Sequence, residues 1–341
     1  MKRRPSRFRA FEYILFLLVT VVVMCLCICV GSVSIPLRDT VTVLWNGLLG
    51  RAQSGSAVPI ILSSRLPRVL CVALSGGALS LCGAAMQGLL KNPLADGSTL
   101  GVSSGASLGA VLAIAFGITF PGLPFGGTVV LAVVFAFLSL LVILGLAYKL
   151  DYSLSTNTII LIGVIFSMFM SSAISVVVTF APEKLKSITF WTMGSLQNSS
   201  YGSALLLLVA FAVFGTVIFF HGSELNAFAV GEDNARHIGV NVRRTKLVIM
   251  ISVSVLIGVC VSVGGTIAFV GLVTPHMIRR IVGPNHRRLL PASAFGGAVF
   301  LLLADLIARI AFNPLELPIG VVTSLVGAVV FIFIFYRTRK G

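Results

Sequence analysis

Long unbroken apolar runs alternate with short polar segments along the whole chain. Most runs are about 20 residues long, the length that an α-helix needs to cross a bilayer. They lack the residue-by-residue alternation of a transmembrane β-barrel. The pattern predicts an all-α integral membrane protein of about ten spans. These spans are expected at 11–33, 66–90, 98–117, 127–148, 156–180, 203–221, 246–263, 265–282, 290–310 and 318–336.

The first run follows five basic residues, which is also how a secretory signal begins. It is too long for a signal, however, and no small-x-small cleavage motif follows it. We therefore expect an uncleaved first span, starting at residue 10 or 11 and ending near 33. Residues 1–341 are expected to form a single transmembrane domain.

The distribution of positive charge predicts the orientation. If both termini are cytoplasmic, 18 of the 25 Lys and Arg residues fall in inner segments and seven in outer ones. This asymmetry is what the positive-inside rule requires. The formal net charge of +15 is then explained by topology, and no nucleic-acid partner is expected. The sequence predicts a multi-pass protein of the cytoplasmic (inner or plasma) membrane, in contact with lipid.

Composition supports this class. The chain is 57% hydrophobic and 10% charged, whereas soluble domains have about 45–50% apolar and about 25% charged residues. A soluble enzyme, a disordered chain and a secreted disulfide scaffold are excluded. The six cysteines lie in apolar runs without CxxC spacing, so we interpret them as unpaired small residues.

Small residues line two of the predicted spans. Gly101, Gly105 and Gly109 form a GxxxGxxxG line on one face of the third span, and residues 75–85 of the second span are also mostly small. In lipid, such faces let helix backbones approach closely. Two interpretations are open: burial of these spans inside the bundle, or a seam between two copies.

Motifs for enzymatic chemistry are absent. The chain has no GxxxxGK[ST] phosphate-binding loop and no HExxH zinc motif, and its four histidines are scattered near the predicted membrane edges. We expect no catalytic residue, metal or cofactor. Asp305 is the only carboxylate well inside a span, and Arg309 follows one helical turn later. The two form either a local ion pair or an outer docking or gating site.

Without its own ATPase or a midplane carboxylate, the protein must take energy from a partner or act as a channel. The cytoplasmic segment 222–245 is the candidate partner site. Glu232 and Asp233 suit the start of a short helix, and Gly239 suits its end. A plain connecting loop is the alternative. The outer segments 35–49 and 183–196 are mixed enough to hold structure of their own.

Several motifs together resemble the permease subunits of ATP-binding-cassette importers for iron–siderophore, haem and cobalamin, the FecCD-type family. The resemblance runs from about residue 65 to 337, with Gly97 and Val329 standing where the family often has proline. Its motifs are Arg65-Leu66-Pro67-Arg68, residues 87–96 with Gln87, Asn92 and Pro93, then Gly101 and Gly105, residues 191–196, Gly231-x-x-x-Ala235-x-x-x-Gly239, residues 265–276, residues 304–309 and residues 316–320.

The resemblance implies a type II importer architecture in which two permeases, alike or different, form the pathway at their interface. A cytoplasmic ATPase dimer would contact Gly231, Ala235, Arg236 and Gly239. An extracytoplasmic binding protein would present acidic residues to Arg65, Arg68 and Arg309; the alternative is that Arg65 and Arg68 only anchor the second span at the headgroups. The pathway and signature residues would be Gln87, Asn92, Pro93, Gly101 and Gly105.

The expected function is ATP-driven import of a chelated iron complex, because polar but uncharged pathway residues such as Gln87, Asn92, Ser103 and Ser104 suit a bulky chelate. A ferric siderophore is expected foremost, since it is the most frequent substrate in the family that the chain resembles. Haem and cobalamin import are the alternatives within the family. Outside it, a stand-alone secondary carrier would show internal repeats, and none is evident. A membrane enzyme would need a polar catalytic cluster, for which His276 with Arg279 and Arg280 is the nearest grouping.

Overall fold

The computed structural model describes residues 9–31, 35–51, 55, 57–120, 126–152 and 154–339. Over these ranges the chain is helical, apart from loops and an isolated bridge between Phe312 and Leu315. Among the described residues, seven helices are long and apolar enough to cross a membrane: α1 (Ala10–Cys29), α3–η1–α4 (Ala57–Leu89), α6 (Gly127–Leu150), α7 (Thr156–Phe180), α9–η4–α10 (Tyr201–Phe220), α13 (Val242–Gly264) and α15 (His286–Ile310).

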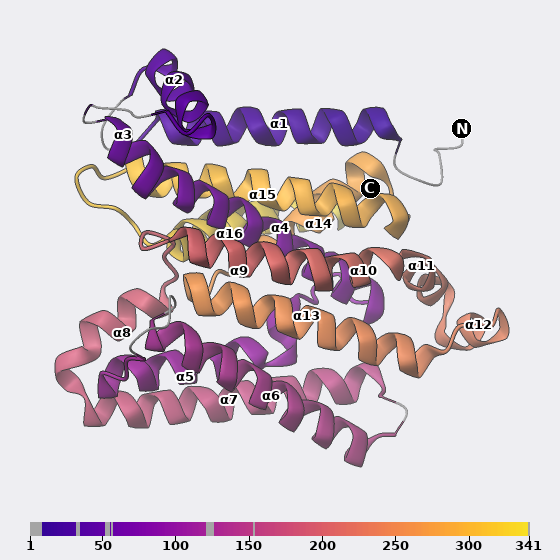
Figure 1. Cartoon of the computed structure of the whole chain (residues 1–341). Coiled ribbons are helices and arrows are strands. Elements are labelled where there is room, and N and C mark those ends of the chain that lie inside the picture. The colour runs from indigo at the N-terminus through magenta and orange to yellow at the C-terminus, as the bar shows by residue number, and fades with distance from the viewer. Residues whose placement is uncertain are drawn as a thin grey trace.

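Shorter helices complete the bundle. Within two of the long helices, the separate elements are α3 (Ala57–Pro59), η1 (Ile60–Arg65), α4 (Leu66–Leu89), α9 (Tyr201–Ala210), η4 (Phe211–Gly215) and α10 (Thr216–Phe220). The remaining ones are α2 (Leu37–Leu48), η2 (Gly97–Leu100), α5 (Val102–Phe116), η3 (Pro182–Lys184), α8 (Leu185–Thr192), α11 (Gly222–Val230), α12 (Glu232–His237), α14 (Val270–Val282) and α16 (Ile319–Arg339). Figure 1 shows the long helices side by side, with α8 at one end of the bundle and α11 and α12 at the other.

Each predicted span contains a helix, but several boundaries were wrong. The first helix ends at Cys29, because Val30 is already extended. The second begins nine residues early, at Ala57. The polar residues that end at Arg65 look like a helix boundary in the sequence. The helix nevertheless continues through them as the wider turn η1, and Arg65 is buried.

The eighth span differs most from the prediction. Residues 265–269 are not helical, because Gly265 and Phe269 both have left-handed backbone angles (φ +68° and +67°). The helix α14 therefore starts only at Val270 and has 13 residues. At the usual rise it is about 20 Å long, shorter than the roughly 30 Å hydrocarbon layer of a bilayer.

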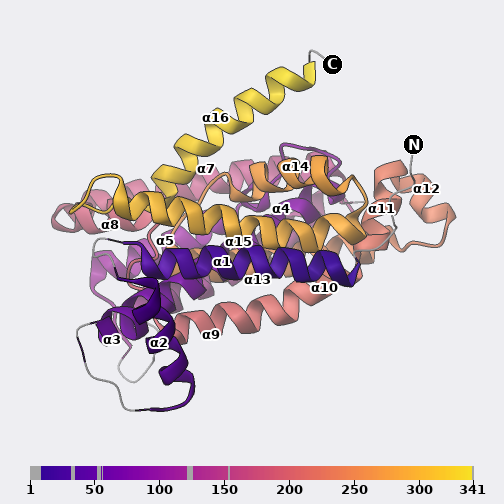
Figure 2. The same cartoon turned by 90° about the horizontal axis from the view of Figure 1, so that it is seen from above.

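The helix α4 is the centre of the bundle, packed against α13, α14 and α15 (Figures 1 and 2). Glycines allow the close approach. A Cβ on Gly76 would lie 2.4 Å from the carbonyl oxygen of Gly297 on α15, and one on Gly83 would lie 1.8 Å from that of Gly271 on α14. The interpretation that small residues bury this span within the bundle is confirmed.

The glycine line of α5 is also used inside the chain. A Cβ on Gly105 would lie 1.7 Å from Oγ of Ser139, and one on Gly109 would lie 2.3 Å from the carbonyl oxygen of Leu131. Both neighbours belong to α6, which packs along α5. This face is therefore buried against a neighbouring helix and does not form a seam between two copies.

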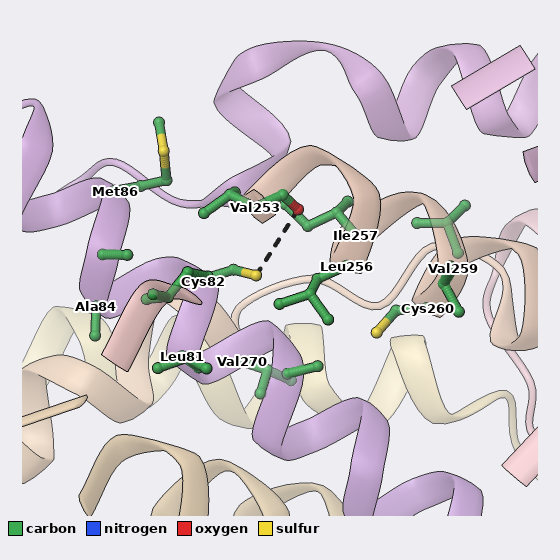
Figure 3. Packing of buried hydrophobic residues seen from close by; sticks show 14 of the residues in the cluster. Leu81, Cys82, Ala84, Met86, Val253, Leu256, Ile257, Val259, Cys260 and Val270 are labelled. Carbon is green, nitrogen blue, oxygen red and sulfur yellow. Dashed lines mark hydrogen bonds between the residues drawn. The ribbon is translucent and has the colours of Figure 1, made fainter. Parts of the chain in front are cut away.

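The cysteines are all free thiols, as predicted. Figure 3 shows Cys82 on α4 directed at Val253 on α13, where its Sγ lies 3.8 Å from the carbonyl oxygen. Cys27, Cys71, Cys82 and Cys260 are buried, whereas Cys25 and Cys29 are half-buried. They fill the core as small apolar side chains.

Candidate translocation and coupling sites

A buried network of charged side chains lies where α1 and α15 end, which the charge pattern predicts to be the outer end. Arg68 on α4 has its guanidinium 2.9 Å from Asp305 on α15 and 2.7 Å from Glu316 in the following loop. Asp305 also pairs with Arg309 at 3.1 Å, so the interpretation as a local ion pair is confirmed. We call these residues, together with Arg65, the outer arginine network.

The network also holds the C-terminus of α1. Arg65 Nη1 donates to the carbonyl oxygens of Ile28 (2.6 Å) and Cys29 (3.0 Å). Arg309 donates to those of Cys27 (2.9 Å) and Val30 (3.1 Å). The last carbonyls of a helix have no partner within it and carry partial negative charge. The network contains three arginines and two carboxylates, so it has one excess positive charge. The carbonyl groups at the end of α1 compensate this charge.

The three arginines are less accessible than the resemblance implies. Their exposed fractions are 6% for Arg65, 8% for Arg68 and 4% for Arg309, and each has partners within the chain. Docking of an acidic binding-protein surface to them stays a prediction. In this conformation, it would require at least one pair of the network to open.

Three glycines join the elements beside this network. Ser195 N, just after α8, donates to the carbonyl oxygen of Gly264 at the end of α13 (2.8 Å). A Cβ on Gly265 would lie 2.2 Å from the carbonyl oxygen of Trp191, and one on Gly320 would lie 2.2 Å from that of Met193. Backbone therefore packs on backbone, so that α8, the break before α14 and the start of α16 form one unit.

A chamber of about 300 Å³ lies between α5, α7, α13 and the segment before α14. Most of its surface is apolar, and we call it the polar chamber because it contains a cluster of hydroxyl groups. Hydroxyl groups dominate its polar lining, and Asp96 adds a carboxylate. Within the described residues, the Ser103 hydroxyl is buried without a hydrogen-bond partner. The polar lining residues are Asp96, Ser103, Ser104, Ser107, Ser171, Thr192 and Thr266.

The predicted signature residues have different structural roles. Gln87 is buried on α4, where Nε2 donates to Leu272 (3.2 Å) and Oε1 accepts from Arg279 (3.2 Å), so it ties α4 to α14. Asn92 caps a turn by accepting from Leu94 N (2.9 Å).

The other signature residues lie apart from Gln87. Pro93 is exposed in the turn capped by Asn92. Gly101 precedes α5 with φ +80°, and Gly105 lies against α6. None of the five predicted signature residues lines the polar chamber, whereas Ser103 and Ser104, which were also expected in the pathway, do.

The segment 222–245 is not a plain loop: it contains two short helices, α11 and α12, of which only α12 was predicted from the sequence. Gly231 separates them with φ +135°, Glu232 opens α12, and Gly239 follows it with φ +89°. Ala235 is fully buried, whereas Arg236 is exposed and pairs with Asp233 at 2.9 Å. The segment therefore presents polar groups together with two apolar side chains, Val230 (72% exposed) and Ile238 (71%), over a packed apolar side.

A residue that sequence reasoning missed connects α12 to the bundle. Lys246 on α13 is fully buried, and its Nζ lies 2.8 Å from Glu232 on α12. The same Nζ donates to the carbonyl oxygen of Leu154, before α7 (2.8 Å). One ammonium group thus joins α12, α13 and the start of α7.

The second link runs from α11 to α15. Asn226 Nδ2 donates to Asn285 Oδ1 (2.9 Å), and Asn226 Oδ1 accepts from the backbone N–H of His286 (2.8 Å). Neither Lys246, Asn285 nor Glu316 was given a site role from the sequence. Glu316 lies in one of the family motifs, but for Lys246 and Asn285 the only signal was position near a predicted membrane edge, which surface polar residues share.

Comparisons with known proteins agree with this architecture. The family model of the FecCD transport family matches residues 18–337. A solved structure, described as a metal-chelate type ABC transporter in an inward-facing conformation, superposes with a TM-score of 0.84 at 29% identity, covering 96% of this chain and 100% of that one. Both cover nearly the whole bundle.

Three curated relatives cover most of the chain. An uncharacterized ABC transporter permease, YvrB of Bacillus subtilis, is 43% identical (91% of this chain, 89% of the relative). The iron(3+)-hydroxamate import permease FhuB of B. subtilis is 35% identical (91% and 79%), and the hemin transport permease HmuU of Yersinia pestis is also 35% identical (91% and 90%). The chain is a multi-pass membrane protein and belongs to the FecCD transport family of permeases.

Proposed function

We propose that this chain is the membrane subunit of an ATP-driven importer that moves a ferric siderophore into the cytoplasm. One observation favours this substrate over haem: no Lys, Arg or His lines the polar chamber among the residues that the structure describes. Haem carries two carboxylates, which arginine or lysine would recognise. A neutral or weakly charged iron chelate suits this surface of hydroxyl and apolar groups better.

Uptake measurements on intact cells test the substrate. Cells lacking this gene are given radiolabelled ferric hydroxamate, ferric catecholate, haem or cobalamin. We expect loss of uptake of a ferric siderophore and its return with the wild-type gene. Normal uptake of both siderophores, with loss of haem or cobalamin uptake, would assign the substrate to that ligand instead. Uptake that persists after ATP depletion would favour a secondary carrier.

The proposed partners occupy three separate surfaces. A cytoplasmic ATPase dimer contacts α11 and α12, a second permease covers the exposed faces of α7 and α16, and a binding protein docks near the outer arginine network. In this arrangement the amino and carboxyl ends lie in the cytoplasm. The contact with a second permease is supported by the apolar side chains that α7 and α16 expose, such as Met168 (67%) and Val329 (69%).

The connections of Lys246 supply a route for coupling. A displacement of α12 by the ATPase pulls on Glu232, and the shared ammonium group passes it to α13 and to the start of α7. Both helices line the polar chamber. ATP binding then shifts the population between two arrangements of the bundle.

Arg236→Ala tests the ATPase contact without disturbing the fold. The Arg236–Asp233 pair is exposed, and such pairs contribute about 0–1 kcal/mol to stability. We expect an unchanged melting temperature, at least a tenfold fall in uptake and weaker recovery of the ATPase in pull-downs. Lys149→Ala, at an exposed lysine near the end of α6 and outside residues 222–245, is the control. Equal uptake by both variants would remove Arg236 from the coupling surface.

A further inference from the structure

A second, larger cavity lies away from the polar chamber and the outer arginine network. It is a groove of about 1100 Å³, and its lining comes from α1, α4, α9, η4, α10, α15 and the start of α11. Figure 1 shows α1 on one side of α4 and α15, and α9 with α10 on the other. The groove therefore has α4 and α15 as its floor and α1 and α9–α10 as its walls.

Small residues keep the floor of this groove open. Ala73 and Gly77 on α4 and Ala294 on α15 line it. A Cβ on Gly77 would already lie 3.2 Å from the carbonyl oxygen of Ala294 and 3.8 Å from the ring of Phe211. The walls carry large apolar side chains, including Leu208 and Phe220, with exposed fractions of 49% and 78%. The groove therefore suits an elongated apolar ligand.

The polar lining is concentrated at one end. Ser223, His286 and Arg287 line the groove near the start of α15, an end that the charge pattern predicts to be cytoplasmic. Arg287 is exposed and has no carboxylate partner within the described ranges, whereas the adjacent Arg288 pairs with Glu12. A cationic group thus stands at the mouth of an apolar groove.

The dimensions match one leaflet of a membrane. From Arg287 to Ala298, both of which line the groove, α15 rises by about 17 Å at 1.5 Å per residue. This is about half of a hydrocarbon layer of roughly 30 Å. An acyl chain extending from a headgroup at Arg287 would therefore fill the groove and end near the bilayer midplane.

We propose that this groove binds one anionic phospholipid of the cytoplasmic leaflet, with its phosphate on Arg287 and an acyl chain over Ala73, Gly77 and Ala294. Arginine pairs well with phosphate oxygens. Figure 2 shows α16 and α9 on opposite sides of the bundle. The groove therefore faces lipid even when a second permease covers α7 and α16.

Native mass spectrometry of the purified full chain tests the site, with phosphatidylglycerol or phosphatidylcholine added at equal concentration. We expect one retained lipid per chain and about fivefold tighter binding of phosphatidylglycerol, the contribution of one basic residue at an anionic surface. Arg287→Gln should remove the preference, whereas Arg244→Gln, an exposed arginine away from the groove, should keep it.

Variants with a filled groove distinguish lipid binding in the groove from general contact with lipid. Ala294→Phe and, independently, Ala73→Phe are expected to abolish retention of both lipids while the helical circular dichroism persists. Retention by both filled variants, or no lipid preference in the wild type, would overturn the proposal. A dimer that both filled variants disrupt would also overturn it, because a second copy would then be the occupant.

Discussion

Lys246 is fully buried, and its ammonium group contacts Glu232 and the carbonyl oxygen of Leu154. Charge at such a position is costly unless it is paired and hydrogen-bonded. The outer arginine network shows the same principle at the other end of the bundle, where Arg68 lies between two carboxylates. At the residue scale, these side chains connect helices that are far apart in the sequence.

Lys246→Met tests the inner connection. The variant keeps the length of the side chain but leaves Glu232 and Leu154 without their shared partner. We expect a loss of about 1.5–3 kcal/mol in the free energy of unfolding, the range for hydrogen bonds to charged groups. Lys149→Met, at an exposed lysine near the end of α6, should change it by less than about 0.5 kcal/mol.

A second substitution checks that the effect comes from the unpaired carboxylate. Glu232→Gln in the Lys246→Met background removes the half-buried negative charge that Lys246 balanced. The double variant should then recover part of the lost stability. Additive losses from the two substitutions would show that the two side chains are not energetically coupled.

Arg309→Gln tests the outer connection. Arg309 donates to the carbonyl oxygens of Cys27 and Val30, so its loss frees the end of α1. In a chain whose only cysteine is Cys27, we expect maleimide labelling to accelerate at least tenfold, because labelling of a buried thiol follows local opening. Arg38→Gln, on the exposed surface of α2, is the control. Unchanged labelling would mean that α1 is held by other contacts.

At the scale of elements, the close approach of helices depends on glycine. Gly83 on α4 faces Gly271 on α14, and Gly76 faces Gly297 on α15. Helices in lipid gain little from apolar burial, so close packing of backbones supplies much of their association. This explains how the short helix α14 is held in the bundle.

Gly83→Ala is expected to destabilise the bundle by about 1–3 kcal/mol, the usual cost of overpacking. The added Cβ would lie 1.8 Å from the carbonyl oxygen of Gly271, so the helices must separate. Gly145→Ala on α6, where a Cβ would meet nothing within 4 Å, should instead stabilise by about 0.5–1 kcal/mol. Unfolding titrations of both variants in mixed micelles measure the difference. Equal effects would contradict the packing argument.

At the scale of the whole molecule, the exposed apolar faces lie on two sides. Figure 2 shows α16 projecting from the bundle on the side away from α9. Side chains such as Met168 on α7 and Leu325 on α16 are about two-thirds exposed. We assign the α7–α16 side to the second permease and the α1–α9 side to lipid.

Photo-crosslinking distinguishes these two surfaces. A photoreactive phenylalanine at Met168 should yield an adduct with a second permease, identical or related, in native membranes. The same group at Leu205, on α9 beside the groove, should yield lipid adducts only. A protein adduct from Leu205 and none from Met168 would reverse the assignment of the two faces.

Hydropathy and charge alone were sufficient to predict an all-helical membrane bundle, because spans of apolar residues satisfy their backbone hydrogen bonds internally. The short helix within 222–245 was likewise predicted from local signals at Glu232 and Gly239, because caps act within one turn. The family followed from motifs that are contiguous in the sequence.

The remaining features of the structure depend on contacts between residues that are far apart in the sequence. The burial of Arg65, Arg68 and Arg309, the pairing of Lys246 with Glu232 and the break before α14 all depend on groups that meet only in the folded bundle. A charge near a membrane edge reads alike in the sequence whether it faces water or a buried partner. Only the packed helices distinguish the two, because the partner comes from a distant part of the chain.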